Sequence, residues 1–342
     1  MNALPFATPL ILAPIAGPGT PELTASVCNA GGFGIHPCAY SAPDEMLRDA
    51  ARIRELTDRP FGVNLFIEEP LAPIADDVLQ AAHERLRPYY EELEADFPAQ
   101  PTRPPDRYNA QVETMLSIAP AVFSFTFGIP KPDVLQRIKR AGIYTIGTAT
   151  TVQEAVAIEE AGVDAVCAQG AEAGGHRGSF LVSGDRAQIG TLALVRQIVR
   201  SVSIPVIAAG GIADSAGIAA VLALGAAAAQ CGTAFLLADE ARTSLPYRTA
   251  LQRASSADTM LTSAFSGRYA RGIRNRFSIE MNDERLQAPY PYQNALTRDL
   301  RIKAAAAGNA EMLNLWAGQA FPLAQAAPAA EIVRALLERY PL

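Results

Sequence analysis

Short hydrophobic runs recur along the chain, each bounded by glycine or proline, and within a run the apolar residues are almost continuous rather than alternating. The eight runs span residues 10–15, 32–35, 61–66, 121–127, 143–148, 165–168, 205–209 and 227–236. Continuous apolar runs of this length are typical of parallel strands that are covered on both faces. Helical patterns separate most of them, so the sequence predicts the α/β class and, within it, a parallel (β/α)8 TIM-type barrel.

A repeated unit of helix, glycine and strand supports the barrel. Thr151 and Glu154 form a capping-box pattern that predicts the start of a helix, and Gly162 predicts its end because glycine readily adopts the left-handed conformation. An apolar run follows at once. The same ending occurs at Gly142 and Gly225, so the second half of the chain is a weak internal repeat.

Two stretches interrupt this rhythm. The first, 67–120, is far longer than a crossover connection needs, and it contains an acidic helical stretch at 75–96 and a proline-rich turn at 98–105. We expect either a lid or side wall over the site, or a solvated helical excursion. His83 lies in this helical stretch among charged neighbours, which predicts a surface position.

The second interruption, 239–303, contains a predicted helix at 247–254, a basic segment at 263–276 and a Pro/Tyr cluster at 289–292. It predicts a small inserted domain over the C-terminal mouth of a barrel formed by residues 1–238 and 304–342. The basic segment either attracts an anionic substrate or is solvated and paired with carboxylates. Helices predicted at 304–318 and 329–340 would complete the outer layer of the barrel.

Composition removes several classes of function. The chain has 342 residues, 49% hydrophobic and 19% charged, with a net charge of -6, so it lacks the basic balance that would attract nucleic acid or an anionic membrane. The apolar stretch 219–238 is interrupted by Gly225 and Gln230, which favours a helix followed by a buried strand over a membrane span.

The four cysteines lie far apart without a Cys-x-x-Cys pair, and the N-terminal stretch is broken by Pro5 and Pro9 and lacks the basic start of a secretion signal. Reduced thiols and a cytoplasmic location are expected.

The stretch 169–178, with the sequence QGAEAGGHRG, follows the apolar run at 165–168. Its glycines predict a loop rather than a helix or strand, at the strand end where α/β proteins bind ligands. Gln169, Glu172, His176 and Arg177 together on one such loop indicate a functional site. The alternative is that His176 caps a turn and the glycines allow tight packing.

Two glycine turns, AAGGI at 208–212 and QCGT at 230–233, follow the seventh and eighth predicted strands. At these positions barrels commonly bind phosphate through exposed backbone N–H groups. Asn64 and Gln169 each end a strand with an amide, which suits the donors and acceptors of a flavin ring, although each could instead cap its own strand end. No spacing typical of metal ligands, of a nucleophilic serine or of a phosphate-loop lysine occurs.

The chain resembles the nitronate monooxygenases, formerly called 2-nitropropane dioxygenases. The resemblance covers nearly the whole chain in order, and the EAGGH block is shared with the flavin-type enoyl-acyl carrier protein reductases. It is carried by LAPIAG at 12–17, GVNL at 62–65, AQGAEAGGHRG at 168–178, IAAGGI at 207–212, QCGT at 230–233 and LWAGQ at 315–319. The segment 36–40, His-Pro-Cys-Ala-Tyr, departs from the family's small glycine-rich segment; His36 either lines the site or belongs to an adapted turn.

The resemblance implies an FMN-dependent enzyme with His176 as the catalytic residue. By matching motif, the residues that would hold FMN are Asn64, Gln169, Gly174, Gly211, Gln230, Cys231, Gly232 and Thr233. It also implies that a nitronate is oxidised by way of FMN and dioxygen to a carbonyl compound and nitrite. The unperturbed pKa of histidine, near 6.5, would let His176 remove a proton when neutral or hold the anion when protonated.

Two alternatives to this function stay open. One is an enzyme of the same fold that takes hydride from NADH and reduces an enoyl thioester or a quinone, and the other is a flavin-binding module without turnover. The expected partners are a small anionic substrate, the nitronate, and dioxygen, with neither nucleic acid nor membrane. Assembly into a homo-oligomer is left open.

Overall fold

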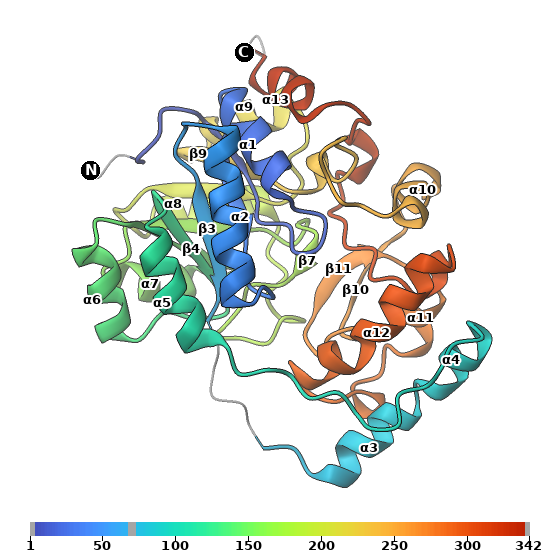
Figure 1. Cartoon of the computed structure of the whole chain (residues 1–342). Coiled ribbons are helices and arrows are strands. Elements are labelled where there is room, and N and C mark those ends of the chain that lie inside the picture. Colours follow the sequence, from blue (N-terminus) through green and yellow to red (C-terminus); the bar gives the residue numbers. More distant parts are fainter. Residues whose placement is uncertain (1–3, 68–72, 339–342) are drawn as a thin grey trace.

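A closed barrel of eight parallel strands forms the larger part of the molecule, which we describe from a computed structural model over residues 4–67 and 73–338 (Figure 1). The barrel closes where β1 pairs with β9. Each of the eight predicted runs overlaps one barrel strand, so the predicted fold class is confirmed. The strands are β1 (Leu10–Leu12), β2 (Phe33–Pro37), β3 (Gly62–Phe66), β4 (Val122–Thr126), β5 (Tyr144–Ala149), β6 (Ala165–Gln169), β8 (Val206–Ala209) and β9 (Ala228–Cys231).

Side chains alternate between the inside and the outside of the barrel. Ile11, Ile35 and Ile146 belong to the cluster that fills the interior, whereas Leu10 and Leu12 pack against the surrounding helices. All five are at most 2% exposed. The barrel is therefore filled by branched side chains, and a ligand can enter only at an end of the strands.

Eight helices surround the barrel, on the left and top of Figure 1. Thr151 caps α7 by accepting a hydrogen bond from the Glu154 N–H at 3.2 Å, and Gly162 ends it with φ of +81°; both features were predicted. The helices are α1 (Pro21–Asn29), α2 (Pro43–Leu56), α5 (Tyr108–Ile118), α6 (Pro132–Arg140), α7 (Val152–Glu160), α8 (Thr191–Val199), α9 (Ser215–Ala223) and α13 (Ala329–Leu337).

Two predictions about the apolar segments of the barrel are confirmed. The stretch 219–238 forms the end of α9 and the buried strand β9, and no helix within the described ranges is long and apolar enough to cross a membrane. The predicted final helix is α13, which packs on α1 and α9 as part of the outer layer; residues 339 and 340, at its predicted end, lie outside the described residues.

A second unit lies beside the barrel, on the right of Figure 1, around its own hydrophobic cluster. It contains a three-stranded antiparallel sheet in the order β10-β11-β7. Its strands are β7 (Gly175–His176), β10 (Thr259–Thr262) and β11 (Ala270–Ile273), and its helices are α10 (Leu245–Arg253), α11 (Arg276–Glu280) and α12 (Tyr292–Ala306). Single 3-10 turns lie at η1 (Thr233–Phe235), η2 (Glu284–Leu286), η3 (Ala310–Met312) and η4 (Phe321–Leu323).

Two local predictions fail in this unit. Gly175 and His176 do not lie in a loop without regular structure, because β11 supplies backbone partners and makes them a short strand. The predicted helix at 304–318 is also wrong, since α12 ends at Ala306 and is followed by Gly308 with φ of +70°. Trp316 then pairs with Gly272 in an isolated bridge. The division into a barrel domain and a 239–303 domain stays a prediction.

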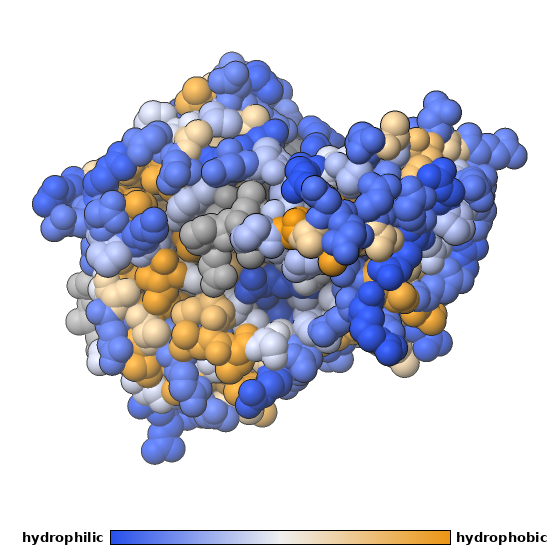
Figure 2. All heavy atoms as spheres, turned by 90° about the horizontal axis from the view of Figure 1, so that it is seen from below, coloured by the Kyte–Doolittle hydropathy of each residue, from blue (hydrophilic) through white to orange (hydrophobic). Residues whose placement is uncertain are grey.

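Residues 76–92, within the long excursion, form α3 (Asp76–Glu84) and α4 (Arg87–Glu92), which pack on the outer side of α11 and α12 (Figure 1). Leu79, Leu86 and Tyr90 enter the hydrophobic cluster of the second unit. The opposite faces of the two helices are solvated, and blue residues predominate on the right of Figure 2, where they lie. Residues 68–72 of the excursion lie outside the described residues.

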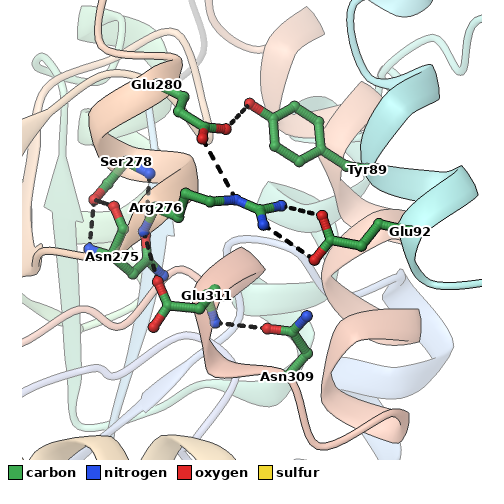
Figure 3. A network of polar contacts seen from close by, with 8 residues as sticks. All are labelled: Tyr89, Glu92, Asn275, Arg276, Ser278, Glu280, Asn309 and Glu311. Atoms are coloured by element: carbon green, nitrogen blue, oxygen red, sulfur yellow. Dashed lines mark hydrogen bonds and ion pairs between the residues drawn. The ribbon is translucent and has the colours of Figure 1, made fainter.

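Polar contacts fasten α4 to the second unit. Figure 3 shows Arg276, the first residue of α11, between Glu280 and Glu92, and its guanidinium donates two hydrogen bonds to the Glu92 carboxylate. The Tyr89 hydroxyl donates to Glu280 at 2.8 Å. The segment around α3 and α4 is therefore a buttress of the second unit.

His83 is buried, and the predicted surface position is wrong. Its side chain is 3% exposed, and its ring stacks on Phe97 with centroids 4.3 Å apart. Neither ring nitrogen has a hydrogen-bond partner. The charged residues that follow it, Glu84 and Arg85, are exposed.

Replacing His83 with phenylalanine should stabilise the protein by about 1 kcal/mol at pH 8, because it removes two buried polar atoms without partners and keeps the stacking on Phe97. Burial lowers the pKa of His83 below its ordinary value of 6.5. The unfolded chain therefore binds more protons below about pH 6.5, and the native state loses stability as the pH falls through that value.

The gain should thus be larger at pH 5 than at pH 8, which thermal unfolding at the two pH values would measure. A matched control is His36→Phe, since His36 is equally buried but both of its ring nitrogens are bonded; this variant should lose stability. A gain from His83→Phe that does not grow at pH 5 would contradict the argument.

Candidate active site

A cavity of about 720 Å³ opens where the carboxyl ends of the barrel strands meet the second unit. No residue of 73–120 lines it, so the predicted lid or side wall is wrong for the part of the excursion that the structure describes. Eight of the nine predicted site residues are on its wall: Asn64, Gln169, Gly174, His176, Gly211, Gln230, Gly232 and Thr233. The cavity is therefore the candidate active site.

Cys231 is the predicted site residue that the cavity wall does not include. In strand β9 the side chain of Gln230 faces the cavity, and the next residue faces the opposite side by the alternation of a strand. Cys231 accordingly packs in the cluster between barrel and helices and is 1% exposed. Burial raises the pKa of its thiol to about 12, so the sulfur is not available to a ligand.

The side-chain amides of Asn64 and Gln169, both predicted to lie at the site, have different hydrogen-bond partners. The Asn64 amide donates to the Ser124 hydroxyl at 2.8 Å and to its carbonyl at 3.2 Å. Gln169 donates to the His176 carbonyl at 3.0 Å and accepts from the Gly178 N–H at 2.8 Å. Gln169 therefore clamps the loop that carries His176, in addition to lining the cavity.

Of the other polar residues on this loop, Arg177 and Glu172 hold the backbone. Arg177 is fully buried, and its guanidinium donates to the carbonyls of Gly170 at 2.7 Å and Gln169 at 2.8 Å. Glu172 accepts from the Thr191 N–H and hydroxyl, each at 2.8 Å. Besides Gln169, the polar side chain of this loop that lines the cavity is thus His176.

His176 lies in a largely aromatic environment. The rings of Phe66, Phe127, Tyr290 and Trp316 surround it with centroids 5.7 to 6.3 Å from that of the imidazole. Its Nε2 is 2.8 Å from the Ser266 hydroxyl.

Burial, together with the positive charges of Arg268 and Arg301, lowers the pKa of His176 to about 3. His176 is therefore neutral at physiological pH. Of the two roles expected for His176, the lowered pKa favours removal of a proton by the neutral ring over holding an anion while protonated.

The basic segment 263–276 does not form one positive patch. Arg271 donates to the Ala171 carbonyl at 2.8 Å, Arg274 lies 3.5 Å from Asp258, and Arg276 is paired with Glu92. Only Arg268 lies close to the site, with its guanidinium 3.8 Å from the centroid of Phe127. Most of its arginines therefore follow the second predicted alternative, in which they are paired rather than free to attract a substrate.

Three arginines that the sequence did not indicate line the cavity, Arg242, Arg298 and Arg301, and among them Arg301 of α12 is the one whose charge acts on His176. Its guanidinium donates to the Thr297 carbonyl, to the carbonyl and side-chain oxygens of Asn294, and to the Asn314 side-chain oxygen in the amide orientation that also accepts from Trp316. These bonds use four of its five N–H groups. No carboxylate forms an ion pair with it within the described ranges.

The sequence contains a helical periodicity that corresponds to the side of the cavity formed by α12. Asn294, Arg298, Arg301, Ile302 and Ala305 recur at helical spacing, and all five line the cavity. Because the helix was predicted to begin at residue 304 rather than at Tyr292, these residues could not be assigned to one helical face.

The segment 36–40, which departs from the family's pattern, contains one residue that is buried away from the cavity and one that lines it. His36 is buried, with Nε2 3.0 Å from the Asp49 carboxylate and Nδ1 3.3 Å from the Thr24 hydroxyl. It does not line the cavity, in agreement with an adapted turn. Tyr40, four residues later, does line it, and its phenol lies near Arg301 and Tyr290.

The glycine turns leave unused donors on the cavity wall. The backbone N–H groups of Gly211, Gly232 and Thr233 donate to no acceptor among the residues that the structure describes. Gly211 has φ of +71°, and an added Cβ would lie 3.1 Å from the Glu172 side chain; at Gly232 it would lie 3.3 Å from that of Ala13. The two turns thus form a narrow cradle of donors without side chains.

Comparison with known proteins agrees with this site. The family model described as nitronate monooxygenase matches residues 1–339. A probable nitronate monooxygenase of Staphylococcus aureus (strain MSSA476) is 41% identical over 333 residues, 97% of this chain and 94% of the relative. A solved nitroalkane oxidase from Streptomyces ansochromogenes has a TM-score of 0.89 and 42% identity, and the match covers 97% of this chain and 95% of that one.

FabK from Thermotoga maritima is more distant, with a TM-score of 0.76 and 30% identity, over 97% of this chain and 92% of its own. The family model matches residues 1–339, and the matches to the nearer relatives cover 97% of the chain. The chain therefore belongs to the nitronate monooxygenase family, and it is an oxidoreductase that oxidises nitronates.

Proposed function

We propose that the cavity binds FMN, with the phosphate at the turns of Gly211 and Gly232 and the flavin ring near Asn64, Gln169 and Gln230. The observation that carries this is the cradle of unused N–H groups, since an anion with several acceptor oxygens would satisfy them. Gly174 packs against the backbone of Ala317 and Gly318, where an added Cβ would lie 2.4 Å from a nitrogen. Glycine there lets two backbone segments of the cavity wall pack directly against each other. Cys231 would contribute only its backbone, which connects Gln230 to Gly232 in the turn at 230–233.

The protein should purify yellow, and replacing Gly211 with leucine should weaken FMN binding by roughly tenfold or more, because a side chain would fill the cradle. Gly142→Leu is the matched control. Gly142 also has a left-handed φ, +74°, and open surroundings, so a side chain there causes the same backbone strain but does not enter the cavity. Flavin fluorescence during titration measures both affinities. A colourless protein that takes up no added FMN, or equal losses in both variants, would contradict the proposed site.

We further propose that the enzyme oxidises alkyl nitronates, and nitroalkanes once their proton is removed, with dioxygen to carbonyl compounds and nitrite. Bound FMN would supply the electron-accepting chemistry. The chain's own residues would bind the anion through Arg301 and Arg268, exclude water with the aromatic rings around His176, and remove a proton from a nitroalkane through the neutral imidazole. The neutral His176 beside two arginines supports this division of roles.

An anaerobic mixing experiment separates this function from its alternatives. Bleaching of the flavin by a nitronate alone supports the proposal, and product analysis after admission of dioxygen should find carbonyl compound and nitrite. Bleaching by NADH alone would indicate the reductase, and bleaching by neither would indicate a binding module. The oligomeric state stays a prediction.

A further inference from the structure

The hydroxyl of Ser266 has three partners, and together they determine where its proton lies. Its Oγ is 3.3 Å from the backbone N–H of Arg268, 3.0 Å from the carbonyl oxygen of Arg268 and 2.8 Å from Nε2 of His176. Ser266 is 1% exposed, so solvent does not compete for these positions. A serine hydroxyl offers one proton and two lone pairs.

One arrangement satisfies all three partners. The Arg268 N–H can only donate, so it takes one lone pair of the Ser266 oxygen, and the Arg268 carbonyl can only accept, so it takes the proton. The remaining lone pair must accept a proton from His176 Nε2. If the hydroxyl instead donated to Nε2, two oxygens with lone pairs would face each other at 3.0 Å, and the carbonyl would lose its donor.

The other ring nitrogen, Nδ1, is then the one with a free lone pair. His176 lines the cavity, and its Nδ1 makes no hydrogen bond to a described residue. It is also not sealed in the protein, unlike both ring nitrogens of His83. A proton acceptor is thus held at the cavity by a contact on the opposite side of the ring.

We infer that Ser266 fixes the neutral imidazole of His176 in the tautomer that carries its proton on Nε2, and that Nδ1 is the nitrogen that takes up the substrate's proton. The second half of the inference rests on the proposed function. With a neutral nitroalkane the α C–H bond breaks, its electron pair delocalises into the nitro group to give the nitronate, and the proton moves to Nδ1. The imidazolium so formed still donates from Nε2 to Ser266, so the hydrogen-bond arrangement survives the transfer.

Nitrogen-15 NMR of the purified holoprotein tests the tautomer without any turnover. The chain has three histidines, so a sample labelled in histidine gives few signals, and His176→Asn identifies those of His176. We expect a single neutral tautomer with the proton on Nε2. A proton on Nδ1, a mixture of tautomers or an imidazolium at neutral pH would overturn the inference.

Variants of Ser266 test the positioning role. Ser266→Ala should populate the second tautomer and lower kcat/KM for a neutral nitroalkane by roughly five- to tenfold, the effect of losing one buried hydrogen bond, while changing the value for preformed nitronate by less than about twofold. Ser266→Thr keeps the hydroxyl and should restore both the tautomer and the rate.

Ser278→Ala is the control for losing a buried hydroxyl of the same unit, because Ser278 is also 1% exposed but bonds to Asn275 rather than to His176. Equal losses with both substrates in Ser266→Ala, or an unchanged tautomer in that variant, would overturn the positioning role. Failure of the proposed function shows itself differently, as unchanged activity in His176→Asn.

Discussion

Replacing His176 with asparagine should leave FMN bound but lower kcat/KM by roughly 10²-fold or more, the range expected when a positioned acid–base group is removed. The loss should be larger with neutral nitroalkane, which needs its proton removed, than with preformed nitronate. His176 and the glycine turns belong to different segments of the cavity wall, so the flavin contacts are expected to survive.

The pH dependence sharpens this test. Because the pKa of His176 is lowered to about 3, the imidazole stays unprotonated throughout the range in which the protein can be assayed. The rate with neutral nitroalkane should therefore show no loss of the base as the pH falls from 8 to 5, whereas a base with the ordinary pKa near 6.5 would lose about one to two factors of ten. Stopped assays of both substrates in wild type and variant measure this. If both rates survive the substitution within a few-fold, His176 is structural.

Removing the charge of Arg301, by Arg301→Met, should raise the KM for nitronate by roughly 10- to 100-fold, the value of one charge-assisted hydrogen bond in a partly buried site. The reason is that the neutral His176 offers the anion no charge, and Arg301 has no carboxylate partner in the described part of the chain. Burial already lowers the pKa of Arg301 to about 10, so an anion beside it recovers a favourable interaction.

The matched control for Arg301 is Arg276→Met. Arg276 is paired with Glu92 and lies away from the cavity wall, so its replacement should change the KM little, in low salt as in high salt. Steady-state kinetics with a nitronate and a separate FMN titration distinguish substrate binding from cofactor binding. A KM that is unchanged in Arg301→Met would show that Arg301 only holds Asn294 and Asn314 in place through hydrogen bonds.

The barrel could be predicted from the sequence because its determinants are local. Each parallel strand lies within a largely apolar run. Three of the helices between the strands, α6, α7 and α9, are followed by Gly142, Gly162 and Gly225, which adopt a left-handed φ without help from distant residues. The glycine turns on the cavity wall were visible for the same reason. A short segment specifies them completely.

The second unit could not be predicted in the same way, since its elements are specified by distant partners. β7 is a strand only because Ala270 and Arg271 pair with His176 and Gly175, and His83 is buried because Phe97 and the rest of the second cluster cover it. The lowered pKa of His176 depends on its burial and then on the charges of Arg268 and Arg301, which follow it by about a hundred residues. The loop sequence alone could not give its protonation state.

The pairing of β7 with β11 also sets an order of events during synthesis on the ribosome. The eight barrel strands are complete once Cys231 has emerged, but His176 gains its backbone partner only when Ala270 has been made. A nascent chain, or a proteolytic fragment that ends between these two residues, would contain all eight barrel strands but not α13, and its histidine strand would have no partner. Under the proposed function, the residues that would hold FMN and the strand that positions His176 therefore depend on different parts of the chain.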